Sequence, residues 1–93
     1  MADDETELLD PYFMPLIREK LGFTQAETAR RMGLSLRAYS DLENRKTPLR
    51  KPHLMAMRLI TLEEAVARGD RSLANITVRE LADAFARLPV PRG

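Results

Sequence analysis

The segment that decides the fold is residues 24–44, which read TQAETARRMGLSLRAYSDLEN. Thr24 and Glu27 have the spacing of a capping box, in which two side chains satisfy reciprocal backbone N–H groups. A helix is therefore expected over 25–32. Gly33 tolerates the positive φ angle of a tight turn, so we expect the chain to turn there rather than continue as helix.

A second helix is expected over 36–44, with Ser35 as its N-cap. Ala29 supplies a small residue where two such helices would cross. The apolar side chains expected at the interface of the two helices are Met32, Leu34, Tyr39 and Leu42. A tight crossing leaves the N-terminal half of the second helix exposed. Such a half fits the major groove of duplex DNA, which is about 12 Å wide.

One more helix is expected before this pair, over about 10–21. Asp10 followed by Pro11 is a suitable helix start, and Gly22 is a suitable stop. The apolar residues expected to share one face of this helix are Leu16, Ile17 and Leu21.

Two helices are expected after the pair. The first covers 52–68, and its apolar residues form more than one stripe, which indicates burial on more than one side. A polar linker is expected over 69–76. Thr77 and Glu80 then form a second capping-box pattern, which predicts a fifth helix over about 78–88.

Length and composition narrow the function classes. A chain of 93 residues is one small domain, and its lack of Cys excludes disulfides, thiolate catalysis and Cys-ligated zinc. No nucleophile–base pair, metal-ligand cluster or glycine-rich phosphate loop is present, so we expect no enzyme and no cofactor. The acidic N-terminus is no signal peptide, and no apolar run approaches the roughly 20 residues that span a bilayer.

Charge is distributed unevenly along the chain, although the formal net charge is only +1. Residues 1–14 carry five Asp or Glu and no Lys or Arg, whereas residues 15–51 carry nine Lys or Arg against four Asp or Glu. A basic middle suggests a polyanion site, and an acidic leader suggests a segment that avoids or competes for it. A charge run can equally be a solvated face.

Residues 21–48, LGFTQAETARRMGLSLRAYSDLENRKTP, resemble the Cro/CI-type (Xre-like) helix-turn-helix family, and the resemblance covers about 14–66. It implies an all-α, five-helix, lambda-repressor-like fold with a C-terminal helix used in dimerisation. The expected organisation is an acidic leader (1–9), a helix-turn-helix domain (10–68) and a linker, fifth helix and tail (69–93).

The resemblance also implies site residues. Arg37 is the strongest candidate for a base contact, because its guanidinium fork matches guanine O6 and N7. The full set expected to face DNA bases is Ser35, Leu36, Arg37, Ser40 and Asp41. The set expected to contact backbone phosphates is Gln25, Asn44, Arg45, Lys46, Arg50 and Lys51.

These expectations together describe a cytoplasmic, homodimeric, sequence-specific regulator that represses a phage, plasmid or other mobile-element operon, including its own gene. Its partner is double-stranded DNA with a palindromic operator, and no membrane or small-molecule effector is evident. The expected dimer interface is Leu81, Phe85 and Leu88, although this face could instead pack on the 52–68 helix. The alternative function is a protein-interaction module, such as an antitoxin, adaptor or anti-activator, with little or no DNA binding.

Overall fold

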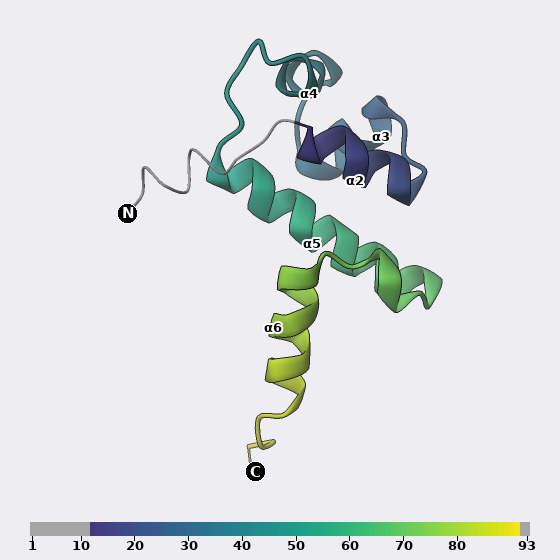
Figure 1. The fold of residues 1–93 in the computed structure, drawn as a ribbon, viewed down its shortest axis with the longest axis vertical. Coiled ribbons are helices and arrows are strands. Elements are labelled where there is room, and N and C mark those ends of the chain that lie inside the picture. Colours follow the sequence, from purple (N-terminus) through teal and green to yellow (C-terminus); the bar gives the residue numbers. More distant parts are fainter. Residues whose placement is uncertain (1–11, 92–93) are drawn as a thin grey trace.

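A computed structural model describes residues 12–91, and the regular structure in that range is helical, which confirms the all-α fold class (Figure 1). The elements are α2 (Phe13–Leu21), α3 (Gln25–Met32), α4 (Leu36–Glu43), α5 (Lys51–Arg68), the short 3₁₀ turn η1 (Arg71–Leu73) and α6 (Ile76–Ala86).

Local side-chain caps set the bounds of α3 and α4. The capping box forms as the sequence predicts: the Thr24 hydroxyl accepts from the Glu27 backbone N–H, and the Glu27 carboxylate accepts from the Thr24 N–H, each at 3.0 Å. Gly33 ends α3 at a φ of 75°. The Ser35 hydroxyl accepts from the Ala38 N–H at 3.0 Å and opens α4, which ends at Glu43, one residue earlier than expected.

Four helices enclose the core. It contains the fully buried side chains of Met14, Ala29, Tyr39, Leu42, Leu49 and Met57, drawn from α2, α3, α4, α5 and the loop before α5. Each is at most 5% exposed. Helices α2 and α5 therefore pack against the α3–α4 pair, and this packing fixes the orientation of α4.

The first helix differs from its expected form in two ways. It begins at Phe13 with Pro15 in its first turn, where a missing N–H costs nothing, and the Asp10–Pro11 start lies outside the described residues. Leu16 is 66% exposed rather than part of the core. Successive residues are rotated by about 100° around the helix axis. Ile17 therefore lies on the same face as the buried Met14 and Leu21, whereas Leu16 points away from that face.

The start of α5 is set by a backbone–side-chain bond. The Arg50 N–H donates to His53 Nδ1 at 3.0 Å, and Pro52 occupies the first turn, so α5 begins at Lys51, one residue earlier than expected. His53 thus has a structural partner at the helix start.

The segment 69–76, expected to be a polar linker, contains the η1 turn and makes specific contacts with α2 and α5. Asp70 accepts from the Ser72 N–H, Ala74 is buried, and Lys20 on α2 donates to the Ser72 carbonyl at 2.7 Å. The Asn75 N–H donates to the Thr61 hydroxyl on α5 at 2.9 Å.

The fifth helix begins two residues earlier than expected and ends two residues earlier. The Asn75 side chain accepts from the Thr77 N–H at 2.9 Å, so α6 starts at Ile76. Thr77 and Glu80 then lie inside the helix rather than at its cap. The expected capping box required the Thr77 N–H to donate to Glu80, but this N–H donates to the Asn75 side chain instead.

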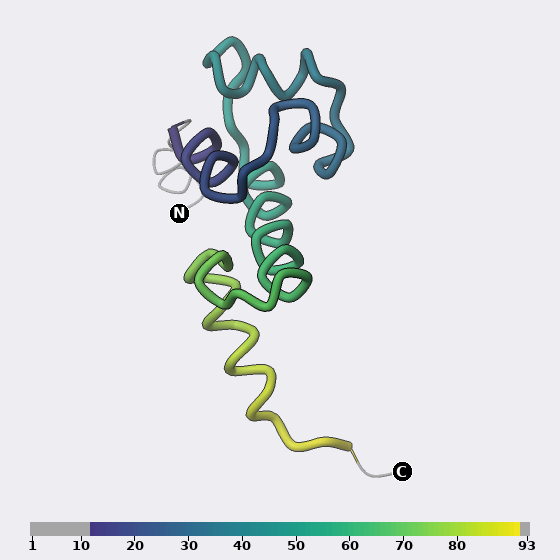
Figure 2. Tube along the Cα trace, turned by 90° about the vertical axis from the view of Figure 1, so that its right-hand side faces the viewer, coloured from purple at the N-terminus to yellow at the C-terminus, as the bar shows by residue number. Residues whose placement is uncertain are grey.

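The described molecule is elongated, with extents of 49 × 34 × 24 Å. Figures 1 and 2 show α2, α3 and α4 gathered on one side of α5, while α6 projects away from these helices. Among residues 12–91, no helix is long and apolar enough to cross a membrane.

Candidate nucleic-acid interface

The first turn of α4 lies on the surface at the end of the molecule farthest from α6 (Figure 1). Tyr39 and Leu42 are buried on the inner side of α4, so the opposite side turns outward. Ser35, Leu36 and Arg37, all expected to face DNA bases, are exposed there. The N-terminal half of α4 therefore exposes the Arg37 guanidinium and the apolar Leu36 side chain. A helix of this kind fits the major groove of DNA.

The other two residues expected to face bases are more enclosed. Ser40 is half-buried, and its hydroxyl accepts from the Asn44 side-chain amide at 3.2 Å. Asp41 is also half-buried and lines a pocket between α4 and the loop that leads to α5. In the unbound protein the freely presented part of α4 is therefore its first turn.

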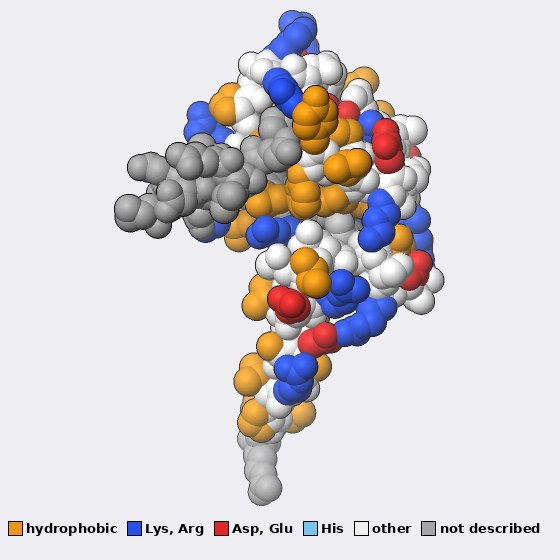
Figure 3. Space-filling view, viewed as in Figure 1, with side chains coloured by type: hydrophobic (Ala, Val, Ile, Leu, Met, Phe, Trp, Pro, Cys, Tyr) orange, Lys and Arg blue, Asp and Glu red, His pale blue; other side chains and the backbone are white. Residues whose placement is uncertain are grey.

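A group of cations follows the C-terminal end of α4. Arg45, Lys46, Arg50 and Lys51 are exposed, as is Asn44. Figure 3 shows Lys and Arg side chains at the end of the molecule where Figure 1 places α4 and the loop after it. Cations beside an exposed helix can contact the DNA phosphates that border a groove.

Arg45 has an unusual backbone. Its φ is +63°, and it is the only non-glycine residue with a positive φ among those described. Its guanidinium lies 4.2 Å from the centroid of the Tyr12 ring, at the start of α2. The left-handed backbone turns the chain sharply after α4, and the aromatic contact braces the arginine beside it.

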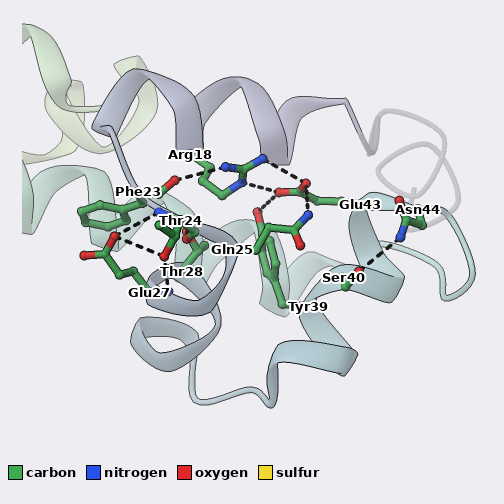
Figure 4. A network of polar contacts seen from close by, with 10 residues as sticks. All are labelled: Arg18, Phe23, Thr24, Gln25, Glu27, Thr28, Tyr39, Ser40, Glu43 and Asn44. Atoms are coloured by element: carbon green, nitrogen blue, oxygen red, sulfur yellow. Dashed lines mark hydrogen bonds and ion pairs between the residues drawn. The ribbon is translucent and has the colours of Figure 1, made fainter.

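Gln25 is placed differently from the other residues expected to contact phosphates. It is half-buried, and its amide nitrogen donates to Glu43 Oε1 at 2.8 Å (Figure 4). The side chain thus points toward α4. It ties the start of α3 to the end of α4.

Glu43 is the centre of a polar network that joins three helices (Figure 4). Arg18 on α2 donates to it through Nε at 2.7 Å and through Nη2 at 3.3 Å, and the Tyr39 hydroxyl also donates to it. The side chains of Arg18 and Glu43 are only 17% and 7% exposed. Arg18 also donates to the Phe23 carbonyl at 3.1 Å, so its guanidinium is held by the loop before α3 as well as by Glu43.

Burial and hydrogen bonding act in opposite directions on the Glu43 carboxyl. Burial raises its pKa, but the hydrogen bonds from Arg18, Tyr39 and Gln25 together outweigh burial, so the pKa lies below its usual value. Burial, together with the bond to Glu43, raises the pKa of the Tyr39 hydroxyl. The bond to Glu43 raises the pKa of Arg18, against the effect of its own burial. Glu43 therefore stays ionised while Tyr39 stays a neutral donor.

Sequence patterns alone did not identify this network. Arg18 and Glu43 are 25 residues apart, and no local motif links them. The available signal was Tyr39, because a buried tyrosine hydroxyl requires a partner, and Glu43 lies one helical turn beyond it.

A second polar cluster supports α3 from the side of α5. Arg31 pairs with Glu64 at 2.8 Å and with Glu63 at 3.0 Å. Its guanidinium also lies 5.4 Å from the centroid of the Phe23 ring. This arginine is therefore engaged within the protein. Among the described residues, no group of three or more His, Cys, Asp or Glu is arranged to hold a metal ion.

Comparison with known proteins shows that residues 16–58 match a family described as helix-turn-helix. No curated protein and no solved structure matched the chain. The matched range runs from α2 through α3 and α4 into α5, which are the helices that enclose the core and present α4. Residues 16–58 are therefore a helix-turn-helix domain of the Cro/CI (Xre-like) type, a domain that DNA-binding regulators carry.

Proposed function

We propose that the protein is a cytoplasmic, sequence-specific transcriptional repressor that binds a palindromic operator in duplex DNA as a homodimer. We also propose that the operator lies in a phage, plasmid or other mobile-element operon that includes its own gene. The observation that carries the proposal is the exposed first turn of α4, followed by a loop rich in cations.

Base recognition is assigned to the outer side of α4. The Arg37 guanidinium can donate two parallel bonds to a guanine, and Leu36 can pack on a thymine methyl group. Ser35 and Ser40 can exchange hydrogen bonds with base edges, and the Asp41 carboxylate can accept from a cytosine amino group. These five side chains come from one helix and its cap, so they would read adjacent base pairs.

Phosphate binding is assigned to the residues after α4. Arg45 and Lys46 at the end of α4, and Arg50 and Lys51 at the start of α5, place positive charge where the DNA backbone would pass. The Asn44 and Gln25 amides would add uncharged donors. Because such contacts release counterions, affinity for any duplex should fall steeply as salt concentration rises.

A dimer is proposed because one small module makes few base contacts. A two-fold dimer reads two half-sites about 34 Å apart, and α6 provides an apolar face for it. Leu81, Phe85 and Leu88 on that face are 65%, 74% and 61% exposed in the single chain. Exposure of large apolar side chains on α6 and just after its end favours intermolecular packing over packing on α5.

The test is fluorescence anisotropy with duplex DNA from upstream of the protein's own gene, compared with a scrambled duplex near physiological salt. We expect the native duplex to bind about a thousandfold more tightly, which is the margin common among specific DNA-binding proteins. Weak and equal binding to both duplexes would contradict autoregulation at this site. If a wider set of duplexes gave the same result, the protein-interaction module would become the better interpretation.

A further inference from the structure

Helix α6 has no buried residue, although the other four α-helices each bury at least two. It is 11 residues long, and isolated helices shorter than about 12–15 residues are marginally stable in water. Figures 1 and 2 show it projecting from α5 into open space. Contacts within one chain therefore leave most of this helix without the packing that normally stabilises one.

The orientation of α6 leaves its large apolar residues exposed and turns a different set of side chains toward α5. Arg79, Ala82 and Asp83 line a pocket against α5 and the η1 turn, and Asp83 pairs there with Arg71. Leu81 and Phe85 lie four residues apart on nearly the opposite side of the helix, and Leu88 follows two residues after the helix ends. In Figure 3, hydrophobic side chains gather over the part of the molecule where Figure 1 places α6.

Helix α5 carries a second apolar stripe on the side away from the core. Its core side holds Met57 and Ile60, which are buried. The second stripe consists of Met55, Leu59, Leu62 and Val66, at spacings of four, three and four, which places all four on one face of the helix. Leu62 is half-buried, while Met55, Leu59 and Val66 are between 53% and 76% exposed.

We propose that in the dimer the α6 stripe of one copy (Leu81, Phe85, Leu88) packs on the α5 stripe of the other (Met55, Leu59, Val66), and that the exchange is reciprocal. This inference rests on the proposed dimer and assigns α5 as the surface that α6 meets. A second copy fits this site because each chain exposes both stripes. A two-fold axis then places the α6 stripe of each copy against the α5 stripe of the other.

The exposed area agrees with a dimer of ordinary size. Each of the six side chains is half to three-quarters exposed, so each offers on the order of 100 Å². Together with their neighbours they approach the roughly 800 Å² per partner that a stable interface buries.

The first test is the oligomeric state of the full chain without DNA, measured by sedimentation velocity across a concentration series. We expect the wild type to be a dimer and both Leu59→Lys and Phe85→Lys to raise the dissociation constant at least tenfold. Leu16→Lys is the matched control, because Leu16 is 66% exposed on α2 and lies outside both stripes, and it should remain dimeric. Circular dichroism should show that all three variants keep the helices α2–α5.

The second test uses the absence of Cys from the chain, so that single cysteines report contacts without background. Under mild oxidation, a mixture of Leu59→Cys and Phe85→Cys chains should form the mixed disulfide faster than either chain alone forms its own. Rapid self-linking of Phe85→Cys, with Leu59→Lys still dimeric, would overturn the proposal in favour of α6 pairing with α6.

A monomeric wild type would also overturn the proposal. If that monomer still preferred its operator in the anisotropy assay, the proposed DNA reading would survive while this interface failed. A dimer with the expected cross-links but no DNA preference would leave the interface standing and contradict the proposed function.

Discussion

Glu43 is a single carboxylate on which the placement of α4 depends. It accepts hydrogen bonds from α2, α3 and α4 and is almost fully buried. Removing the charge of a buried ion pair leaves its partner uncompensated, so we expect Glu43→Gln to lower the free energy of unfolding by about 3 kcal/mol. Urea denaturation measures this change. The control is Glu63→Gln, because Glu63 is half exposed, and its pair with Arg31 should contribute little. An equal loss in both variants would contradict the special role of Glu43.

The same carboxylate predicts a pH dependence. Its pKa in the folded protein lies below the usual value of 4.5, because the bonds from Arg18, Tyr39 and Gln25 outweigh the effect of burial. The unfolded chain therefore takes up this proton first as pH falls. The stabilisation is fully present above the unfolded pKa and is lost as pH falls through the folded pKa. The stability difference between wild type and Glu43→Gln should thus be constant near neutral pH and shrink below about pH 4.5. Urea titrations at several pH values would show it, and a difference that grows on acidification would contradict the assignment.

Arg45 combines backbone strain with a proposed role in DNA binding. A left-handed conformation costs an L-residue roughly 1–2 kcal/mol, and glycine adopts it without that cost. We expect Arg45→Gly to stabilise the fold by less than about 1 kcal/mol, because glycine also adds entropy to the unfolded chain and the Tyr12 contact is lost. Its affinity for DNA should fall. Lys46→Ala is the control: it should weaken DNA binding similarly without the gain in thermal stability. A destabilised Arg45→Gly would show that the aromatic contact outweighs the strain.

At the scale of the element, α4 separates base reading from phosphate binding. Arg37→Ala should lose about 1–3 kcal/mol of discrimination at one base position and leave affinity for other sequences almost unchanged. Lys46→Ala should instead weaken binding to every sequence and reduce the slope of affinity against salt. Anisotropy titrations over a panel of single-base variants at several salt concentrations would distinguish the two. Unchanged discrimination in Arg37→Ala would show that α4 is not the recognition helix.

Elements defined by adjacent residues were predictable, whereas those defined by distant contacts were not. The capping box of Thr24 and Glu27 lies within one turn, so the sequence specified the start of α3. The start of α6 was misplaced because Asn75 and Thr77 compete as caps, and the Asn75 bond to Thr61 on α5 is invisible in a local pattern. The site followed the same rule. The exposed first turn of α4 was foreseen from a helix pattern, but the bonds that enclose Gln25 and Ser40 arise only on folding.

At the scale of the whole molecule, α4 and α6 lie at opposite ends (Figure 1). The exposed first turn of α4 and the apolar stripe of α6 therefore do not compete for the same face, whereas Lys51 of the phosphate set lies one helical turn from Met55 of the α5 stripe. Helix α5 connects them, since its first residue belongs to the phosphate set and its second apolar stripe belongs to the proposed interface. A dimer formed along α5 would set the separation of the two α4 helices, and with it the spacing of half-sites.

The charge distribution gives the last prediction. Five acidic residues lie within the first ten positions, and Tyr12, the first described residue, contacts Arg45 in the proposed phosphate set. Because Tyr12 lies beside Arg45, we expect the acidic segment that precedes it in the sequence to compete with DNA phosphates for these cations. Replacing all five by amides (Asp3→Asn, Asp4→Asn, Glu5→Gln, Glu7→Gln, Asp10→Asn) should strengthen binding to random-sequence DNA several-fold at about 50 mM salt. The gain should vanish at high salt, where charges are screened within a few ångströms.

The control for this prediction removes carboxylates elsewhere on the surface. Glu19 and Glu63 are exposed on α2 and α5, away from the loop after α4. The double variant Glu19→Gln/Glu63→Gln should change affinity much less per charge removed, because its charges do not lie beside the proposed phosphate contacts. An equal effect per charge would mean that only net charge matters. No effect of the five amides at low salt would mean that the acidic segment keeps away from the DNA surface, so that the basic module is open to DNA at all times.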